Sequence, residues 1–253
     1  RCRKRYPEEC ISAPALISWY VGWNLSHSPF DSPRVRRAFL HAIDREALAG
    51  VALGSGFYPS TGGFVPPGMP GHSEGISLPH DPERARQLLS EAGYPGGRGL
   101  PVLELLSVST RGPVGEFLQA EWGENLGVEI RCVNVGLAEM HDRLANDAPP
   151  IFSLAWRAEY PDPDNFLRVA PIRRHARWHN KAYDRLLEKA TRCTDQEERM
   201  RLYGQADRML IDEAVIMPYA YGRFDLLVKP WVRGLPTSAT RYWFWKNVIL
   251  EPH

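Results

Sequence analysis

Strand and helix patterns alternate through the middle of the chain, and this alternation constrains the fold more than any other feature. Apolar strand patterns at 101–109, 128–134 and 151–156 are separated by helical patterns at 113–126 and near 137–146. A helix between two strands carries the chain back across the sheet, so the strands that it joins pair in parallel. The sequence therefore predicts an α/β fold with a central, mostly parallel sheet flanked by helices.

Two segments before this region also carry regular patterns. Residues 14–25 (PALISWYVGWNL) alternate apolar and aromatic side chains, which predicts a strand. Ser32 and Asp81, each followed by a proline, predict the first residues of two helices, because Ser and Asp cap helix N-termini and proline suits the first helical position. Residues 54–78 are rich in Gly, Pro and Ser and predict a long loop.

The C-terminal part begins with two predicted helices, at about 180–192 and 195–213. The second carries an apolar stripe that predicts core packing, formed by Met200, Tyr203, Ala206 and Leu210. After it, the chain returns to strand patterns, which read VIMPYAYG, FDLLVKP and RYWFWKNVIL. The last of these is apolar and aromatic, so we expect it to pair with a neighbouring molecule or to pack on its own lobe.

Composition limits the class of protein. The chain has 253 residues, a formal net charge of +1 and 43% hydrophobic residues, which suits one large domain or two small ones. The nearly neutral charge gives no electrostatic reason to expect a nucleic acid partner. No apolar run approaches the roughly 20 residues of a membrane span. No signal peptide is visible, so we expect the chain to be mature or cut from something longer.

The motifs of common enzymes are missing from the sequence. It contains no G-x-S-x-G nucleophile motif, no Gly-rich dinucleotide loop and no phosphate loop, so we expect neither catalysis nor a cofactor. A carboxylate pair such as Glu159 and Asp162 is compatible with acid/base hydrolysis, but so is any short acidic loop.

Two further pairs of residues leave alternatives open. His175 and His179 are four residues apart and would share a helix face as metal ligands do, but the surrounding arginines would repel a cation, and we predict no metal site. Cys2 and Cys10 lie close in sequence and are either joined in an oxidising compartment or reduced.

Residues 154–167, which read LAWRAEYPDPDNFL, carry the most informative pattern. A short apolar strand ends at Trp156 and is followed at once by Glu159, Asp162 and Asp164. We interpret it as a ligand-facing strand end, where a carboxylate meets a positive group on a bound solute. Aromatic side chains give ligand pockets a large apolar wall, so we expect Trp156 to line the pocket.

The order of the motifs resembles the extracytoplasmic solute-binding proteins of ABC importers, specifically the oligopeptide, dipeptide and nickel family. The resemblance runs from about residue 16 to the end of the chain. It rests on five segments, which read WNLSHSPFDSPRVRRAFLHAIDREAL, GGFVPPGMPG, DPERARQLLSEAGY, LAWRAEYPDPDNFL and VKPWVRGL.

This resemblance implies a periplasmic-binding-protein-like lobe. Family members are about twice as long and enclose the ligand between two lobes. The match implies that 14–229 form the second lobe, that 1–13 are an N-terminal segment, and that 230–253 cross back toward the first lobe. One lobe offers one wall of the site, so we expect weak binding by this chain alone.

The resemblance also implies roles for single residues. A bound peptide would pair as an added strand with the main chain at Ala155 and Arg157. Glu159 stands where the family usually has an aspartate that binds the peptide amine, and Ser153 does not match the arginine that some relatives use for the carboxylate. The expected ligand-binding set is completed by Trp156, Tyr160 and Asp162.

The function expected from the resemblance is uptake of peptides or similar small solutes, with ABC permease subunits as partners. The location would be periplasmic or extracellular, with lipid anchoring of the full-length protein left open. Two alternatives remain at this point. In the first, the lobe is the ligand-sensing domain of a regulatory protein, which the neighbouring genes would reveal. In the second, it binds nickel or a metal chelate through His175 and His179.

Overall fold

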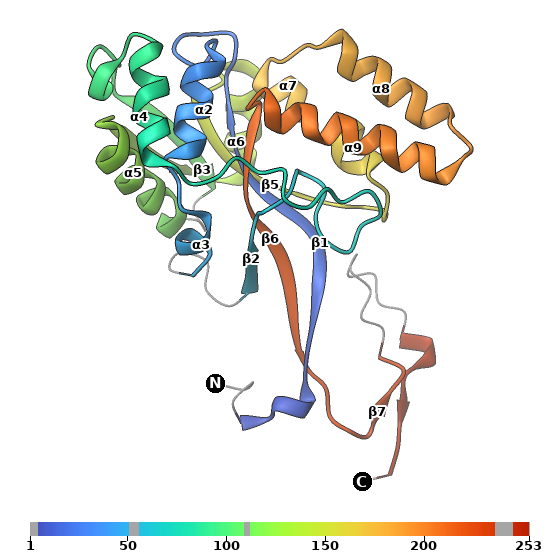
Figure 1. Cartoon of the computed structure of the whole chain (residues 1–253). Coiled ribbons are helices and arrows are strands. Elements are labelled where there is room, and N and C mark those ends of the chain that lie inside the picture. Colours follow the sequence, from blue (N-terminus) through green and yellow to red (C-terminus); the bar gives the residue numbers. More distant parts are fainter. Residues whose placement is uncertain (1–4, 51–55, 109–111, 236–244, 253) are drawn as a thin grey trace.

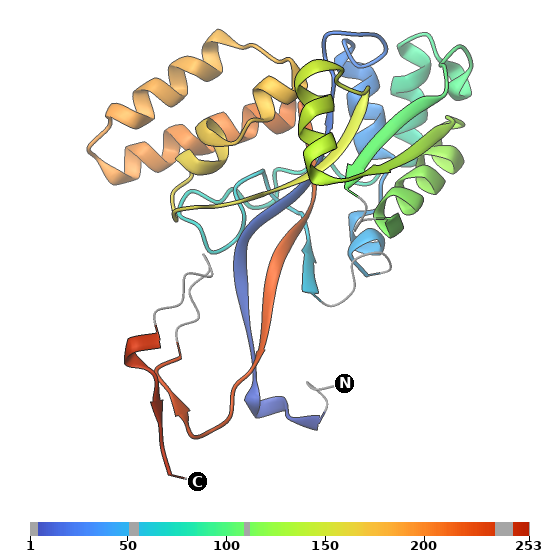
Figure 2. The ribbon, with the colours of Figure 1, turned by 180° about the vertical axis from the view of Figure 1, so that it is seen from behind.

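The computed structural model describes residues 5–50, 56–108, 112–235 and 245–252. Helices lie on both faces of a six-stranded sheet, and a two-stranded ribbon extends from it (Figures 1 and 2). The strand order is β2-β6-β1-β5-β3-β4. The strands are β1 (Cys10–Trp23), β2 (Phe57–Pro59), β3 (Leu103–Val108), β4 (Ile130–Val135), β5 (Ile151–Arg157) and β6 (Ile216–Leu227).

The helices match the predicted positions within a few residues, except for α7, which was not predicted. They are α2 (Pro33–His41), α3 (Arg45–Leu48), α4 (Pro82–Glu91), α5 (Gly112–Leu126), α6 (Leu137–Asn146), α7 (Ile172–Ala176), α8 (Lys181–Arg192) and α9 (Gln196–Asp212). Asp81 caps α4 as predicted, since its carboxylate accepts a hydrogen bond of 2.9 Å from the Arg84 backbone N–H. Ser32 occupies the expected N-cap position of α2 but makes no side-chain capping bond. None of the helices in these ranges is long and apolar enough to cross a membrane.

The sheet is mixed, which corrects the prediction that it is mostly parallel. β3 pairs in parallel with β4 and β5, and these three strands are the ones that α5 and α6 connect. β1 runs antiparallel to both β5 and β6, and β2 runs antiparallel to β6. The alternation of strands and helices along the sequence predicts parallel pairing only for strands that a crossover helix joins. No such helix joins β1 to its neighbour β6.

The long strands β1 and β6 extend beyond the helical layers as a ribbon (Figure 1). β1 begins at Cys10, four residues before the expected start of the lobe, and Cys10 pairs with Leu227 at the far end of β6. Cys2 lies outside the described residues, and Cys10 has no disulfide to a described cysteine.

The C-terminal strand pattern forms a small hairpin of its own. β8 (Ile249–Leu250) pairs antiparallel with β7 (Val232–Arg233), after a short 3-10 turn at Trp245–Asn247. Residues 241–244 of the RYWFWKNVIL segment lie outside the described part. The described end of this segment therefore pairs with β7 and not with the lobe at 14–229. Pairing with a neighbouring molecule stays a prediction.

Two large apolar cores fill the faces of the sheet, and β1 contributes to both. Tyr20 of β1 belongs to the core under α8 and α9, whereas Val21 and Trp23 belong to the core under α2, α4 and α5. Successive side chains of a strand point to opposite faces, which explains this division. Tyr203, Ala206 and Leu210 are fully buried and Met200 packs against them, which confirms the predicted stripe of α9.

Candidate functional site

β5 is the strand on which the candidate site is built. Along one side it pairs with β1, and the backbone N–H of Ala158 donates to the Leu16 carbonyl at 2.9 Å while that of Asn24 donates to the Pro150 carbonyl at 3.0 Å. In an antiparallel pair, alternate residues direct their N–H and C=O toward the partner strand. Even-numbered residues of β5 therefore face β1, and the backbone groups of Ala155 and Arg157 point to the opposite edge.

That opposite edge is only partly covered by β3. The parallel register of β3 and β5 joins Leu105 to Ile151 and ends where Ser107 meets Ser153. Beyond Ser153, no described strand pairs with this edge of β5. The main chain at Ala155 therefore offers an N–H and a C=O at a strand edge that another extended chain could extend.

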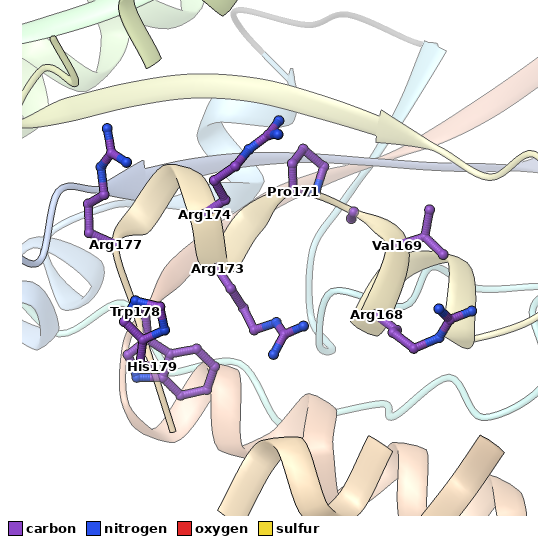
Figure 3. A pocket seen from close by; sticks show the side chains of 9 residues that line it. Arg168, Val169, Pro171, Arg173, Arg174, Arg177, Trp178 and His179 are labelled. Carbon is purple, nitrogen blue, oxygen red and sulfur yellow. The ribbon is translucent and has the colours of Figure 1, made fainter. Parts of the chain in front are cut away.

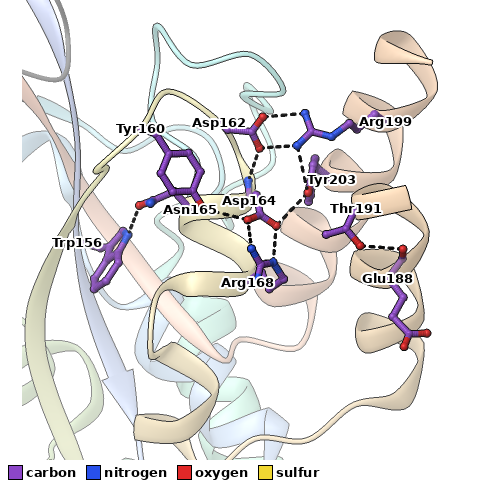
Figure 4. Close-up of polar contacts among 10 residues, drawn as sticks. All are labelled: Trp156, Tyr160, Asp162, Asp164, Asn165, Arg168, Glu188, Thr191, Arg199 and Tyr203. Atoms are coloured by element: carbon purple, nitrogen blue, oxygen red, sulfur yellow. Dashed lines mark hydrogen bonds and ion pairs between the residues drawn. The ribbon is translucent and has the colours of Figure 1, made fainter. Parts of the chain in front are cut away.

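Trp156 lies one residue further along, on the face of the sheet that carries α9. Its ring is partly buried against the larger core, and its indole N–H donates to the Asn165 side-chain oxygen at 2.9 Å (Figure 4). Asn165 is fully buried, so this bond fixes both the ring and the turn that follows β5. The structure thus places Trp156 between core and surface at the strand end.

Glu159 lies two residues after the end of β5 and is exposed to solvent. It makes no hydrogen bond or ion pair with any residue that the structure describes. Its carboxylate is therefore available to a positive group that approaches the edge of β5.

Asp162 is held in a salt bridge. Arg199 of α9 donates to both of its carboxylate oxygens, at 2.7 and 2.8 Å, and the backbone N–H of Asp164 donates to one of them at 2.9 Å. This bidentate geometry is the strong form of an arginine–carboxylate pair. Asp162 was expected to contact ligand, and the structure places it as the link between the turn and α9 (Figure 4).

Asp164 is the centre of a buried polar network. Its carboxylate accepts hydrogen bonds from Arg168 at 2.7 Å, from the Tyr160 hydroxyl at 3.0 Å and from the Tyr203 hydroxyl at 3.1 Å. Burial raises the pKa of this carboxyl, but the bonds from Arg168, Tyr160 and Tyr203 together hold the pKa below its usual range. Tyr160 is thus tied to Asp164 through its hydroxyl, while 38% of the residue stays exposed.

A second buried carboxylate, that of Asp207, was not identified from the sequence. Asp207 of α9 is fully buried and accepts hydrogen bonds from the backbone N–H of Phe64 at 2.7 Å and of Val65 at 3.4 Å. A side chain at Gly63 would lie 2.1 Å from the Asp207 carboxylate, so this approach requires glycine. The sequence did contain one sign of this role. Asp207 lies four residues after Tyr203 and therefore falls on the apolar face of the helix, where a carboxylate is unusual.

The histidine pair does not form the helical arrangement that the metal alternative requires. α7 ends at Ala176, and Arg177 adopts a left-handed conformation with a φ of 56°. His175 is therefore buried within the helix, whereas His179 lies exposed beyond its end. No cluster of three or more metal-ligating side chains occurs among the described residues.

Comparison of the sequence with known protein families gives a match. The model for bacterial extracellular solute-binding proteins, family 5, matches residues 3–171, which is about two thirds of the chain. The chain belongs to this family. The sequence-based recognition is thereby confirmed, and the edge of β5 lies within the matched region.

Similar proteins point to the same family. Heme-binding protein A of Haemophilus influenzae is 30% identical over 236 residues, which covers 88% of this chain and 42% of that protein. A dipeptide-binding protein of Pseudomonas aeruginosa is 30% identical over 239 residues, covering 90% of this chain and 44% of that protein. The unliganded open form of the periplasmic murein tripeptide binding protein MppA superposes with a TM-score of 0.85 at 25% identity, covering 100% of this chain and 51% of that one.

These matches confirm a periplasmic-binding-protein-like lobe. The chain spans less than half the length of the first two relatives and about half of MppA. Its fold is therefore that of one part of a larger binding protein.

Proposed function

We propose that this family 5 chain supplies one wall of the solute-binding cleft of an ABC importer, and that its solute is a peptide or a similar small molecule. The observation that carries the proposal is the edge of β5, where Ala155 directs its backbone groups away from β1 and no described strand pairs beyond Ser153. An extended peptide gains main-chain hydrogen bonds at such an edge, independently of its side chains.

In this proposal Glu159 binds the amine of the solute. It is exposed, makes no bond with a described residue, and lies just beyond the strand to which the peptide would add. A carboxylate and an ammonium group form a charge-assisted hydrogen bond, which is stronger than a neutral one. Glu has one methylene more than the aspartate usual in the family and can reach the same amine from slightly further away.

The other residues of the site act mainly on its shape. Trp156 supplies an apolar wall beside the strand end, held by Asn165. Tyr160 and Asp162 are tied to Asp164 and Arg199, so they hold the turn in which Glu159 lies. Arg157 adds a second set of main-chain groups on the same edge as Ala155.

The setting follows from the family. We infer a periplasmic or extracellular location, with ABC permease subunits as the partners that accept the solute. Membrane association of the full-length protein through a lipid anchor belongs to the same proposal. The whole protein would close two lobes around the solute, since closure buries most of the ligand surface.

Replacement of Glu159 tests the amine contact. Glu159→Gln removes the charge and keeps the shape, so we expect a free tripeptide to bind about 1.5–3 kcal/mol more weakly, the range for a hydrogen bond to a charged group. An NMR titration is suited to the weak binding of a single wall. Glu188→Gln, which removes an exposed charge on α8, is the matched control.

An N-acetylated tripeptide completes the experiment. It has no charged amine, so wild type and Glu159→Gln should bind it equally. Equal affinity of the two proteins for the free tripeptide would remove Glu159 from the site.

A further inference from the structure

A pocket of about 460 Å³ lies between the π-helical turn Asn165–Val169, α7 and the turn after it. Its lining includes four arginines and one histidine, and no carboxylate lines it (Figure 3). These residues are Arg168, Arg173, Arg174, Arg177 and His179. The proposed solute edge at Ala155 and Glu159 does not contribute to the lining.

Two of the four arginines are already neutralised. Arg168 forms an ion pair with Asp164, and Arg173 forms one with Asp184 of α8. These two guanidinium groups therefore add little net positive charge to the pocket.

The other two arginines have no carboxylate partner among the described residues. Arg177 donates to the backbone carbonyl of Ala145 at 2.9 Å, at the end of α6, and forms no ion pair there. Arg174 is exposed, and its guanidinium group makes no bond with a described residue. The pocket thus carries about two uncompensated positive charges.

The backbone turns sharply at the end of α7. The left-handed conformation of Arg177 turns the chain, and its N–H caps the helix by donating to the carbonyls of Arg173 and Arg174. His175 lies between these arginines and is 5% exposed. Burial, followed by the positive charges of Arg174, His141 and Arg177, lowers the pKa of His175 to about 4, and no carboxylate opposes this shift.

We propose that this pocket binds a small oxyanion of the phosphate type. The lining carries positive charge that no lining carboxylate offsets, which matches an anion, and the planar donor pairs of guanidinium groups suit oxygen acceptors. A metal cation would be repelled by the same charges, and an apolar ligand would have to desolvate them.

The pocket is connected to the turn after β5. Arg168 lines the pocket and also bonds to Asp164, whose carboxylate accepts from Tyr160 next to Glu159. An anion in the pocket competes for Arg168 and would act on the turn through this chain of bonds. The anion site itself does not depend on the proposed solute function.

Titration of the 253-residue chain with inorganic phosphate tests the site. At constant ionic strength, we expect saturable NMR shifts of the Arg174 and Arg177 guanidinium signals. Arg174→Gln should weaken phosphate binding about tenfold or more, the loss of one charge-assisted contact. Arg177→Gln, at the second uncompensated charge, should weaken it similarly. A parallel titration with glycerol 3-phosphate shows whether the pocket prefers a phosphate ester or free phosphate. Tighter binding of one of the two compounds identifies the preferred form.

The control is Arg86→Gln, which removes an exposed arginine on α4 and should leave phosphate binding unchanged. Shifts that do not saturate with either phosphate compound would overturn the proposal. Equal weakening by Arg174→Gln and Arg86→Gln would do the same, since it would show a response to net charge alone.

Discussion

Asp207 illustrates how one buried carboxylate can organise a loop. It lies in the apolar interior, where two backbone N–H groups donate hydrogen bonds to it and the nearby positive charge of Arg208 offsets its burial only in part. Burial therefore dominates and raises its pKa to about 7. The GGFVPPGMPG segment is held in place by this group and by the Tyr221 hydroxyl, which donates to the Gly63 carbonyl at 2.6 Å.

This raised pKa predicts a pH dependence of stability. The carboxyl is protonated more readily in the folded chain, so its contribution is fully present below about pH 4 and is lost as the pH rises toward about 7. Asp207→Asn cannot ionise and should lose less stability between pH 5 and pH 8 than wild type, by a difference on the order of 1–3 kcal/mol. Thermal melting of both proteins across this range measures the difference, and parallel pH profiles would contradict it.

At the scale of elements, the sequence predicted most strands and helices because their patterns are long and regularly capped. It did not predict the π-helical turn at 165–169 or α7. There the apolar periodicity is interrupted by Pro163 and Pro171, and the chain closes an unusual bond between the Ala170 N–H and the Asn165 carbonyl at 3.0 Å.

The candidate site was predictable in part. Proximity along the chain places Trp156, Glu159 and Tyr160 together, but the direction of the Ala155 backbone groups depends on the register with β1. The salt bridge from Arg199 to Asp162 joins residues 37 positions apart, which no local pattern indicates.

Proline substitution tests the strand edge directly. The Ala155 N–H faces away from β1, so Ala155→Pro should retain the fold and weaken tripeptide binding about tenfold or more through the lost main-chain donor. Ala158→Pro is the matched contrast, because the Ala158 N–H bonds to Leu16 in the sheet and its loss should lower the melting temperature. Wild-type tripeptide affinity in Ala155→Pro would exclude strand addition at this position.

At the scale of the whole molecule, the ribbon of β1 and β6 and the β7–β8 hairpin extend away from the helical layers (Figure 2). Ile249 and Leu250 of β8 are 62% and 71% exposed, and Trp245 beside them is 59% exposed. In a two-lobed protein this surface would face the other lobe, and in this chain it is an apolar patch.

The patch predicts self-association of the chain. In light scattering, we expect the particle size of the wild-type chain to increase with concentration, and Ile249→Lys combined with Leu250→Lys should reduce this increase. The melting temperature should stay nearly unchanged, because exposed side chains add little to stability. Association at the wild-type level in the double variant would place the contact elsewhere.

Hydrogen exchange at the Ala155 amide, with and without a tripeptide, tests the central claim most directly. If the peptide adds to the edge of β5, exchange at Ala155 slows on binding, whereas the Leu154 amide, which faces β1, stays protected in both states. Saturation with the tripeptide while Ala155 exchanges at its original rate would show that the solute binds somewhere else.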